Sequence, residues 1–185
     1  MDAPGQLWPR HGRTHSPHTY DNNFEGAITL RHVLEESRKI PAIKMMDTLG
    51  PQNVLAYAKR FGFEEDFPPY LPIAVGAGDA TLLEATSAYS VFPNQGVRMK
   101  PFALLRVRDR DGNLIEENCA EPVDVIRADT AFTMTNLLRG VLVRGTAQRT
   151  AGLVGDWPLA GKTGTVDDNT DAWFIGFDPT TTVGV

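Results

Sequence analysis

Apolar side chains recur every three or four residues in the first third of the chain, which predicts three short helices. The first begins at Thr29, a good N-cap, and cannot run cleanly past Ile40, because Pro41 disfavours helical backbone in the residue before it. The second ends at Gly50, and the third follows directly and ends at Gly62. The inward positions expected in these helices are Leu30, Val33, Leu34, Ile43, Met46, Leu49, Val54, Leu55, Ala58 and Phe61.

Two further helices and a hairpin are predicted in the middle of the chain. Residues 81–92 open with the capping-box pattern Thr-Leu-Leu-Glu, and residues 129–143 form the second helix. Between them, residues 103–107 and 114–115 flank a turn at Asp111-Gly112, which is typical of a β-hairpin. The core positions expected in the second helix are Phe132, Leu138 and Val141.

The last thirty residues have the pattern of antiparallel strands. The expected strands are 159–166, 172–177 and 181–185, and a turn at 167–169 joins the first two. Helices followed by such strands predict an α+β fold, in which an antiparallel sheet packs with helices. Because Val185 falls inside an apparent strand, we expect a fold that is incomplete at this end.

The chain length and composition bound the domain organisation. The 185 residues suffice for one domain and are too few for two ordinary ones. Residues 1–25 are rich in Pro, Gly, His and Asn without periodicity, which predicts an irregular arm or loop. Residues 26–185 are expected to form one partial domain, truncated at both ends.

Charge and cysteine content exclude several classes of function. The net charge of −5 argues against nucleic-acid binding, which favours a basic face. The single cysteine rules out an internal disulfide framework and a zinc ribbon. No apolar run approaches the roughly 18 residues of a membrane span, so no membrane contact is expected from this segment. His11, His15 and His18 lie in a segment broken by Gly and Pro, and neither a metal nor a cofactor is expected.

The serines and the Gly-Lys-Thr string of this chain match no known nucleophilic or phosphate-binding motif. None of the four serines, Ser16, Ser37, Ser87 and Ser90, lies in a Gly-x-Ser-x-Gly or Ser-x-x-Lys pattern. Gly161-Lys162-Thr163 resembles the end of a P-loop, but Asp156 stands where that motif needs glycine. The chain therefore carries neither a serine nucleophile beside its base nor a P-loop.

One compact motif remains, Lys162-Thr163-Gly164-Thr165. On an extended strand, a cation, two hydroxyls and a glycine form a surface suited to a peptide that ends in a carboxylate. An edge strand can bind such a peptide by strand addition. The same residues also suit an edge strand whose charge merely prevents aggregation, and four residues alone favour that second interpretation.

The wider context favours the first interpretation, because several blocks resemble class A (bifunctional) penicillin-binding proteins. Residues 161–177 resemble their third catalytic motif and the strand that follows it. Residues 23–31 with 37–42 resemble their second-motif helix, 83–97 the helix and turn before the central hairpin, and 139–147 the segment before the third motif. The resemblance runs in order over about residues 20 to 185 and implies the C-terminal portion of a penicillin-binding transpeptidase domain, whose fold is also that of serine β-lactamases.

The resemblance implies a peptidoglycan D,D-transpeptidase, which acylates a serine with a D-Ala-D-Ala stem peptide and is the target of β-lactams. The expected catalytic residues here are Ser37, Lys39 and Lys162, with Ser37 relaying a proton and Lys162 stabilising the substrate carboxylate. Thr163, Gly164 and Thr165 are expected to bind substrate, and the Thr165 backbone N–H is expected to supply half of the oxyanion hole. By the same resemblance, the domain works outside the bacterial cytoplasmic membrane, downstream of a glycosyltransferase domain.

Two departures from the family pattern leave alternatives open. The family's Ser-x-x-Lys segment is missing, so the chain is either a fragment of a longer protein, inactive alone, or a catalytically silent relative. The second motif reads Ser37-Arg38-Lys39, with lysine where the family has asparagine, so a group that donates and accepts becomes one that only donates. The alternatives are a non-catalytic domain that binds cell-wall peptide or protein, and a serine β-lactamase or carboxypeptidase relative.

Overall fold

The chain is described here by a computed structural model. The described residues are 1–3, 7–10, 13–15, 23–150, 152, 155–165 and 172–185. No described helix is long and apolar enough to cross a lipid bilayer. The expected turn at 167–169 lies outside the described residues, and so do His11 and His18.

Three short helices follow one another near the N-terminus, as predicted: α1 (Leu30–Glu35), α2 (Lys39–Leu49) and α3 (Pro51–Phe61). The Thr29 hydroxyl caps α1 by accepting from the backbone N–H of His32, and α3 ends at Gly62 with a left-handed φ of 100°. A short 3-10 helix, η1 (Leu71–Val75), follows.

The inward positions of these helices are only partly confirmed. Val33, Ile43 and Met46 are buried, whereas Leu30 and Leu49 are exposed and Val54, Leu55, Ala58 and Phe61 are half-buried. Both exposed leucines lie at the end of a helix: Leu30 is the first residue of α1, and Leu49 is the last residue of α2.

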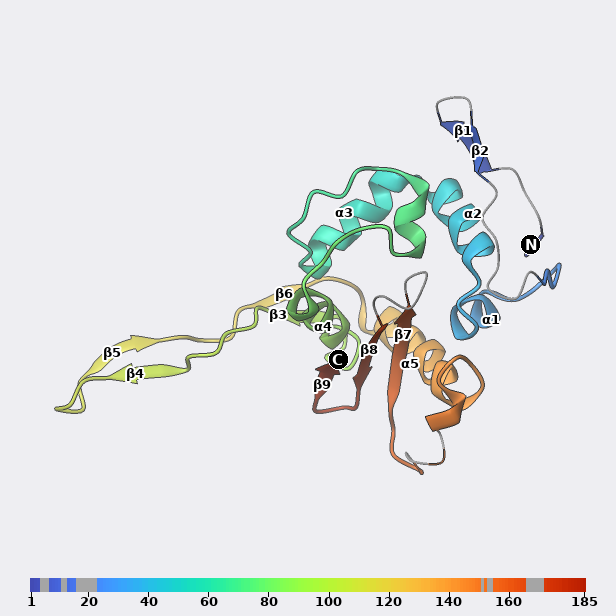
Figure 1. The fold of residues 1–185 in the computed structure, drawn as a ribbon. Helices are drawn as coiled ribbons and strands as arrows, with labels where there is room; N and C mark the ends of the chain where they lie inside the picture. Colours follow the sequence, from blue (N-terminus) through green and yellow to red (C-terminus); the bar gives the residue numbers. More distant parts are fainter. Residues whose placement is uncertain (4–6, 11–12, 16–22, 151, 153–154, 166–171) are drawn as a thin grey trace.

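The middle of the chain contains the predicted capped helix and hairpin. In α4 (Leu82–Ser90), the Thr81 and Glu84 side chains form the predicted capping box. The hairpin strands are β4 (Arg106–Arg108) and β5 (Leu114–Glu117), and the hairpin projects away from the other elements (Figure 1). At its base β3 (Val97–Met99) pairs with β6 (Pro122–Asp124), a ladder not predicted because three residues are too few to show an alternating pattern.

The long helix α5 (Ala128–Val143) and the short η2 (Gln148–Thr150) lead into the last sheet. Leu138 and Val141 are buried, as expected for core positions. The prediction for Phe132 is wrong, because its ring lies 73% exposed on the opposite flank of the helix.

The C-terminal sheet joins β7 (Ala160–Thr165), β8 (Ala172–Phe177) and β9 (Thr182–Gly184) in antiparallel order β7-β8-β9. Helix α5 packs on β7, and α4 packs on β8 and β9 (Figure 1). Leu138, Ala160 and Phe177 form a buried cluster between helices and sheet. The α+β fold with an antiparallel sheet is confirmed, and β7 is an edge strand among the described residues.

The N-terminal segment differs from the expected irregular arm in one respect. Residues Leu7–Arg10 (β1) and Arg13–His15 (β2) pair as a short antiparallel hairpin. Asp2 forms an isolated antiparallel bridge with Gly26. Pairing within the hairpin satisfies its backbone groups without the alternating apolar pattern that would have signalled strands.

Candidate active site

Ser37 occupies the turn between α1 and α2, with its side chain exposed. Its φ of 51° lies in the left-handed region, which a residue with a Cβ adopts rarely. The turn is closed by backbone hydrogen bonds, including one of 2.9 Å from the Arg38 N–H to the carbonyl of Val33. The reversal points the Ser37 hydroxyl towards the C-terminal sheet, where Lys162 donates to it.

Lys162 connects this turn to the edge strand β7. Its Nζ donates a hydrogen bond to Ser37 Oγ and another, of 2.8 Å, to the carbonyl of Thr163. The first contact joins residues 125 positions apart, so only the fold brings them together. Burial lowers the pKa of Lys162 from its usual 10.5 to about 8, because the charged form loses hydration. This side chain can therefore exchange a proton near neutral pH.

The other predicted substrate-binding residues follow Lys162 along β7. Thr163 is half-buried, and Gly164 and Thr165 are exposed at the end of the strand. A Cβ added at Gly164 would meet only Trp173 Cβ, at 3.8 Å, so the chain leaves the space above this glycine open. The backbone of an extended ligand has room to approach β7 here.

Lys39 stands at the first position of α2, two residues after Ser37, and is half-buried. The sequence prediction thus places Ser37 and Lys39 on one turn, and the structure adds Lys162 and Thr163 to that turn through the Ser37–Lys162 contact.

Thr146 is a further residue near the candidate site that no sequence motif indicated. Its hydroxyl lies 2.7 Å from the hydroxyl of Thr163, and its backbone N–H donates to the carbonyl of Glu35 at 3.1 Å. The only signal in the sequence was its position in the block 139–147, because nothing local in that block reveals a contact with α1 and β7 at once.

A cluster of charged side chains around the buried Asp2 and Arg38 adjoins the Ser37 turn. The Arg38 guanidinium forms ion pairs with Asp2, at 3.3 Å, and with Glu25, and His32 contacts the same Glu25 at 2.6 Å. Asp2 is fully buried and Arg38 nearly so. Breaking a buried ion pair leaves an uncompensated charge, so this cluster resists displacement of the turn.

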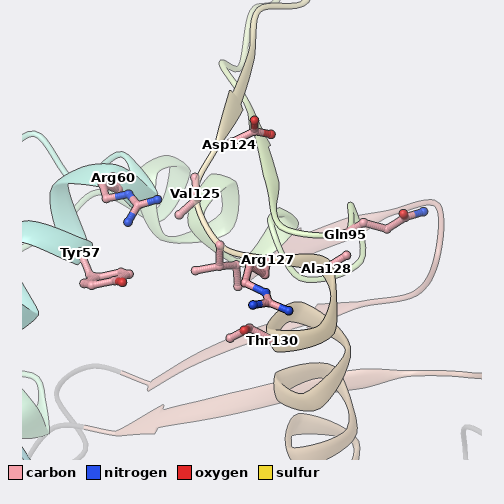
Figure 2. Close-up of a pocket in the computed structure, with 9 residues that line it drawn as sticks. Tyr57, Arg60, Gln95, Asp124, Val125, Arg127, Ala128 and Thr130 are labelled. Carbon is pink, nitrogen blue, oxygen red and sulfur yellow. The ribbon is translucent and has the colours of Figure 1, made fainter.

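A separate hollow of about 550 Å³ lies between α3 and the N-terminus of α5 (Figure 2). The Tyr57 ring with Arg60 stacked over it at 4.9 Å lines one side, and Arg127 and Thr130 line the other. The described residues that line it include none of the predicted site residues. We therefore place the candidate active site at the Ser37–Lys162 contact and the open edge of β7.

Comparison with known proteins shows the family to which the chain belongs. Residues 4–184 match the family model of the penicillin binding protein transpeptidase domain. Penicillin-binding protein 1A of Aquifex aeolicus is 38% identical over 177 residues, which cover 96% of this chain and 24% of that protein. Penicillin-binding protein 1A of Neisseria gonorrhoeae is 35% identical over 189 residues, with 96% and 23% covered. The chain thus spans about a quarter of the length of these relatives.

Solved structures share the fold. The crystal structure of penicillin-binding protein 1A from Haemophilus influenzae superposes with a TM-score of 0.87 at 23% identity, covering 95% of this chain and 32% of that one. The structure of the PonA1 protein from Mycobacterium tuberculosis in complex with penicillin V gives a TM-score of 0.83 at 19% identity, covering 99% and 52%.

Proposed function

The chain belongs to the penicillin-binding protein transpeptidase family, and we propose that it forms part of a peptidoglycan D,D-transpeptidase within a longer protein. In this proposal, a serine elsewhere in that protein attacks the D-Ala-D-Ala amide of a stem peptide. D-alanine leaves, and the acyl group passes to an amine on a neighbouring strand. The observation that supports this proposal most directly is the hydrogen bond between Lys162 and Ser37, because it joins the family's second and third motifs in one site.

The proposed chemistry assigns a role to each side chain. Lys162 neutralises the terminal carboxylate of the substrate, and its lowered pKa lets it pass a proton to or from the Ser37 hydroxyl near neutral pH. Ser37 relays that proton to the departing or attacking amine. Lys39 extends the charged surface of the same turn.

The edge of β7 holds the peptide in the proposal. Thr163 and Thr165 hydrogen-bond the substrate, and Gly164 lets its backbone lie close to the strand. The N–H of Thr165 supplies half of the oxyanion hole, and the N–H of the attacking serine supplies the other half. Removal of one such donor costs about 3–4 kcal/mol of barrier.

The proposed partners and location follow from the family. The ligands are the D-Ala-D-Ala stem peptide and the β-lactams that mimic it, and the PonA1 structure contains penicillin V. The proposed site of action is the outer face of the bacterial cytoplasmic membrane. A glycosyltransferase domain upstream is proposed from the class A resemblance and from relatives about four times as long as this chain.

The decisive experiment labels the full-length gene product with a fluorescent penicillin and separates it by denaturing electrophoresis. We expect a Ser-x-x-Lys segment in that product and a labelled band that Lys162→Ala weakens at least about tenfold, a barrier increase of about 1.4 kcal/mol. Lys59→Ala is the matched control, because Lys59 is an exposed lysine whose ion pair is with the exposed Asp66. Absence of a labelled band from a product that contains the segment refutes the proposal.

A second candidate function rests on Lys39. A cation in place of the family's asparagine favours a domain that binds cell-wall peptide without turning it over. Calorimetry with a D-Ala-D-Ala peptide separates the two proposals. Reversible binding by a full-length protein that is not acylated supports the second, whereas acylation excludes it.

A further inference from the structure

Glu35 is a buried carboxylate two residues before Ser37, and no part of the proposed chemistry uses it. Its side chain is 5% exposed, and it pairs with Arg144 at the C-terminal end of α5 and, at 3.5 Å, with Arg31 one turn earlier in α1. Arg144 Nε donates to it at 3.1 Å, and the second nitrogen of the guanidinium contacts the other carboxylate oxygen. This hydrogen bond holds the pKa of the Glu35 carboxyl below its usual value, although burial acts in the opposite direction.

Two glycines of the α5 segment make room for Glu35. A Cβ at Gly140 would lie 1.8 Å from a carboxylate oxygen of Glu35, and one at Gly145 would lie 2.2 Å from its backbone carbonyl oxygen. Both approaches are closer than any side chain permits. The end of α5 is therefore shaped to receive this one residue of α1.

The pair lies beside a closed ring of contacts that contains the candidate active site. From Glu35 the ring runs along the backbone to Ser37, and from its hydroxyl to Lys162. The Thr163 hydroxyl contacts that of Thr146 at 2.7 Å, and the Thr146 N–H returns to the Glu35 carbonyl at 3.1 Å. The ring closes without Arg144, which lies two residues before Thr146 in the chain. Each link of the ring is a single hydrogen bond or the chain itself, whereas Glu35–Arg144 joins α1 to the end of α5 beside the ring as a bidentate ion pair.

We infer that the Glu35–Arg144 ion pair is a positioning device that holds the Ser37 hydroxyl against the Lys162 amine. It holds the turn after α1 against the end of α5, and the contact between the Thr146 and Thr163 hydroxyls links that end to β7. Ser37 has the left-handed φ of 51°, a conformation that persists only where its surroundings hold it. The Arg38 ion pairs hold this turn to the N-terminal segment, and Glu35–Arg144 holds it to the end of α5. The inference rests on the proposed function only for its consequence in catalysis.

The test measures the Lys162 pKa in the 185-residue chain by NMR titration of ¹³C-labelled lysine, with Lys162→Met identifying the signal. We expect Glu35→Gln to raise this pKa by about 1 unit, because a displaced Ser37 turn admits water to the amine. Loss of the Glu35 charge acting through space has the opposite sign, since removal of an anion lowers the pKa of a lysine. A rise therefore reports displacement and not a lost charge.

Three further variants complete the test. Arg144→Lys keeps the positive charge but loses the bidentate contact, so it is expected to raise the Lys162 pKa by less than Glu35→Gln does. Thr146→Val removes the hydroxyl contact with Thr163 at an exposed residue, so we expect it to keep the fold and to raise the Lys162 pKa. It therefore tests the ring even if Glu35→Gln does not fold. Glu117→Gln is the matched control, because Glu117 is another arginine-paired glutamate, 2.9 Å from Arg106 Nε on the projecting hairpin.

The outcomes separate this inference from the proposed function. An unchanged or lowered Lys162 pKa in folded Glu35→Gln, or an unchanged one in Thr146→Val, overturns the positioning role. An equal rise in Glu117→Gln overturns it too. None of these titrations depends on acylation, so a full-length protein that penicillin does not label contradicts the proposed function alone.

Discussion

Replacement of Gly145 by alanine tests the closest backbone approach at the candidate site. The added Cβ would stand 2.2 Å from the Glu35 carbonyl oxygen and 2.8 Å from its carbon. An ordinary C–H···O contact needs about 3.3 Å, so two backbone segments must separate by about 1 Å. Backbone, unlike the end of a flexible side chain, cannot rotate out of the way.

The expected cost combines two effects. Overpacking of this kind costs about 1–3 kcal/mol. The separation also breaks the 3.1 Å hydrogen bond from the Thr146 N–H to the Glu35 carbonyl, which contributes about 0.5–1.5 kcal/mol. Gly145→Ala is therefore expected to lower the free energy of unfolding by about 1.5–4.5 kcal/mol. Urea unfolding followed by circular dichroism measures this as a lower midpoint at an unchanged m-value.

Gly164→Ala is the matched control. A Cβ at Gly164 meets only Trp173 Cβ at 3.8 Å, an ordinary contact, and this strand position has no left-handed φ. We expect its free energy of unfolding to stay equal or rise by up to about 1 kcal/mol, because alanine loses less backbone entropy than glycine on folding. If Gly145→Ala is as stable as Gly164→Ala, the close approach of α1 to the end of α5 is refuted.

Two further predictions concern the proton balance and the core. The pKa of Lys162 is about 8 in the folded chain, against the usual 10.5, so the unfolded chain binds more protons between these two pH values. The free energy of unfolding is therefore expected to rise with pH over that window. Urea unfolding at pH 7 and at pH 10 measures the rise, and an equal rise in Lys162→Met would contradict it. Leu138→Ala is expected to lose about 2–5 kcal/mol, because the side chain is 2% exposed. Phe132→Ala, whose ring is 73% exposed, is expected to lose at most about 0.5 kcal/mol in the same urea assay, and a loss as large as that of Leu138→Ala would contradict its exposed position.

Local signals in the sequence predicted most elements of the fold. Thr81 and Glu84 form the expected capping box, and glycines 50 and 62 end the helices where expected. These features depend only on neighbours within one turn of helix, so they can be read without knowing the fold. The β3–β6 ladder could not, because its strands are three residues long and pair across the whole projecting hairpin.

The exposure of individual apolar residues was also beyond local prediction. Phe132 and Leu138 both fit the helical pattern of α5, yet only Leu138 faces β7 and β8. The helix is long enough for one apolar flank to miss the sheet. Which flank that is depends on how α5 is rotated against the sheet, and this is a property of packing.

The sequence by itself determined the chemical groups of the candidate site: a lysine, two threonines and a glycine on one strand, and a serine 125 positions before that lysine. Only the tertiary structure decided that Ser37 and Lys162 meet, that burial lowers the Lys162 pKa, that Glu35 pairs with Arg144 and that Thr146 contacts Thr163. The physical reason is the distance along the chain over which each interaction acts. Caps, turns and strand alternation act between neighbours in sequence, whereas desolvation and ion pairing depend on what lies nearby in space.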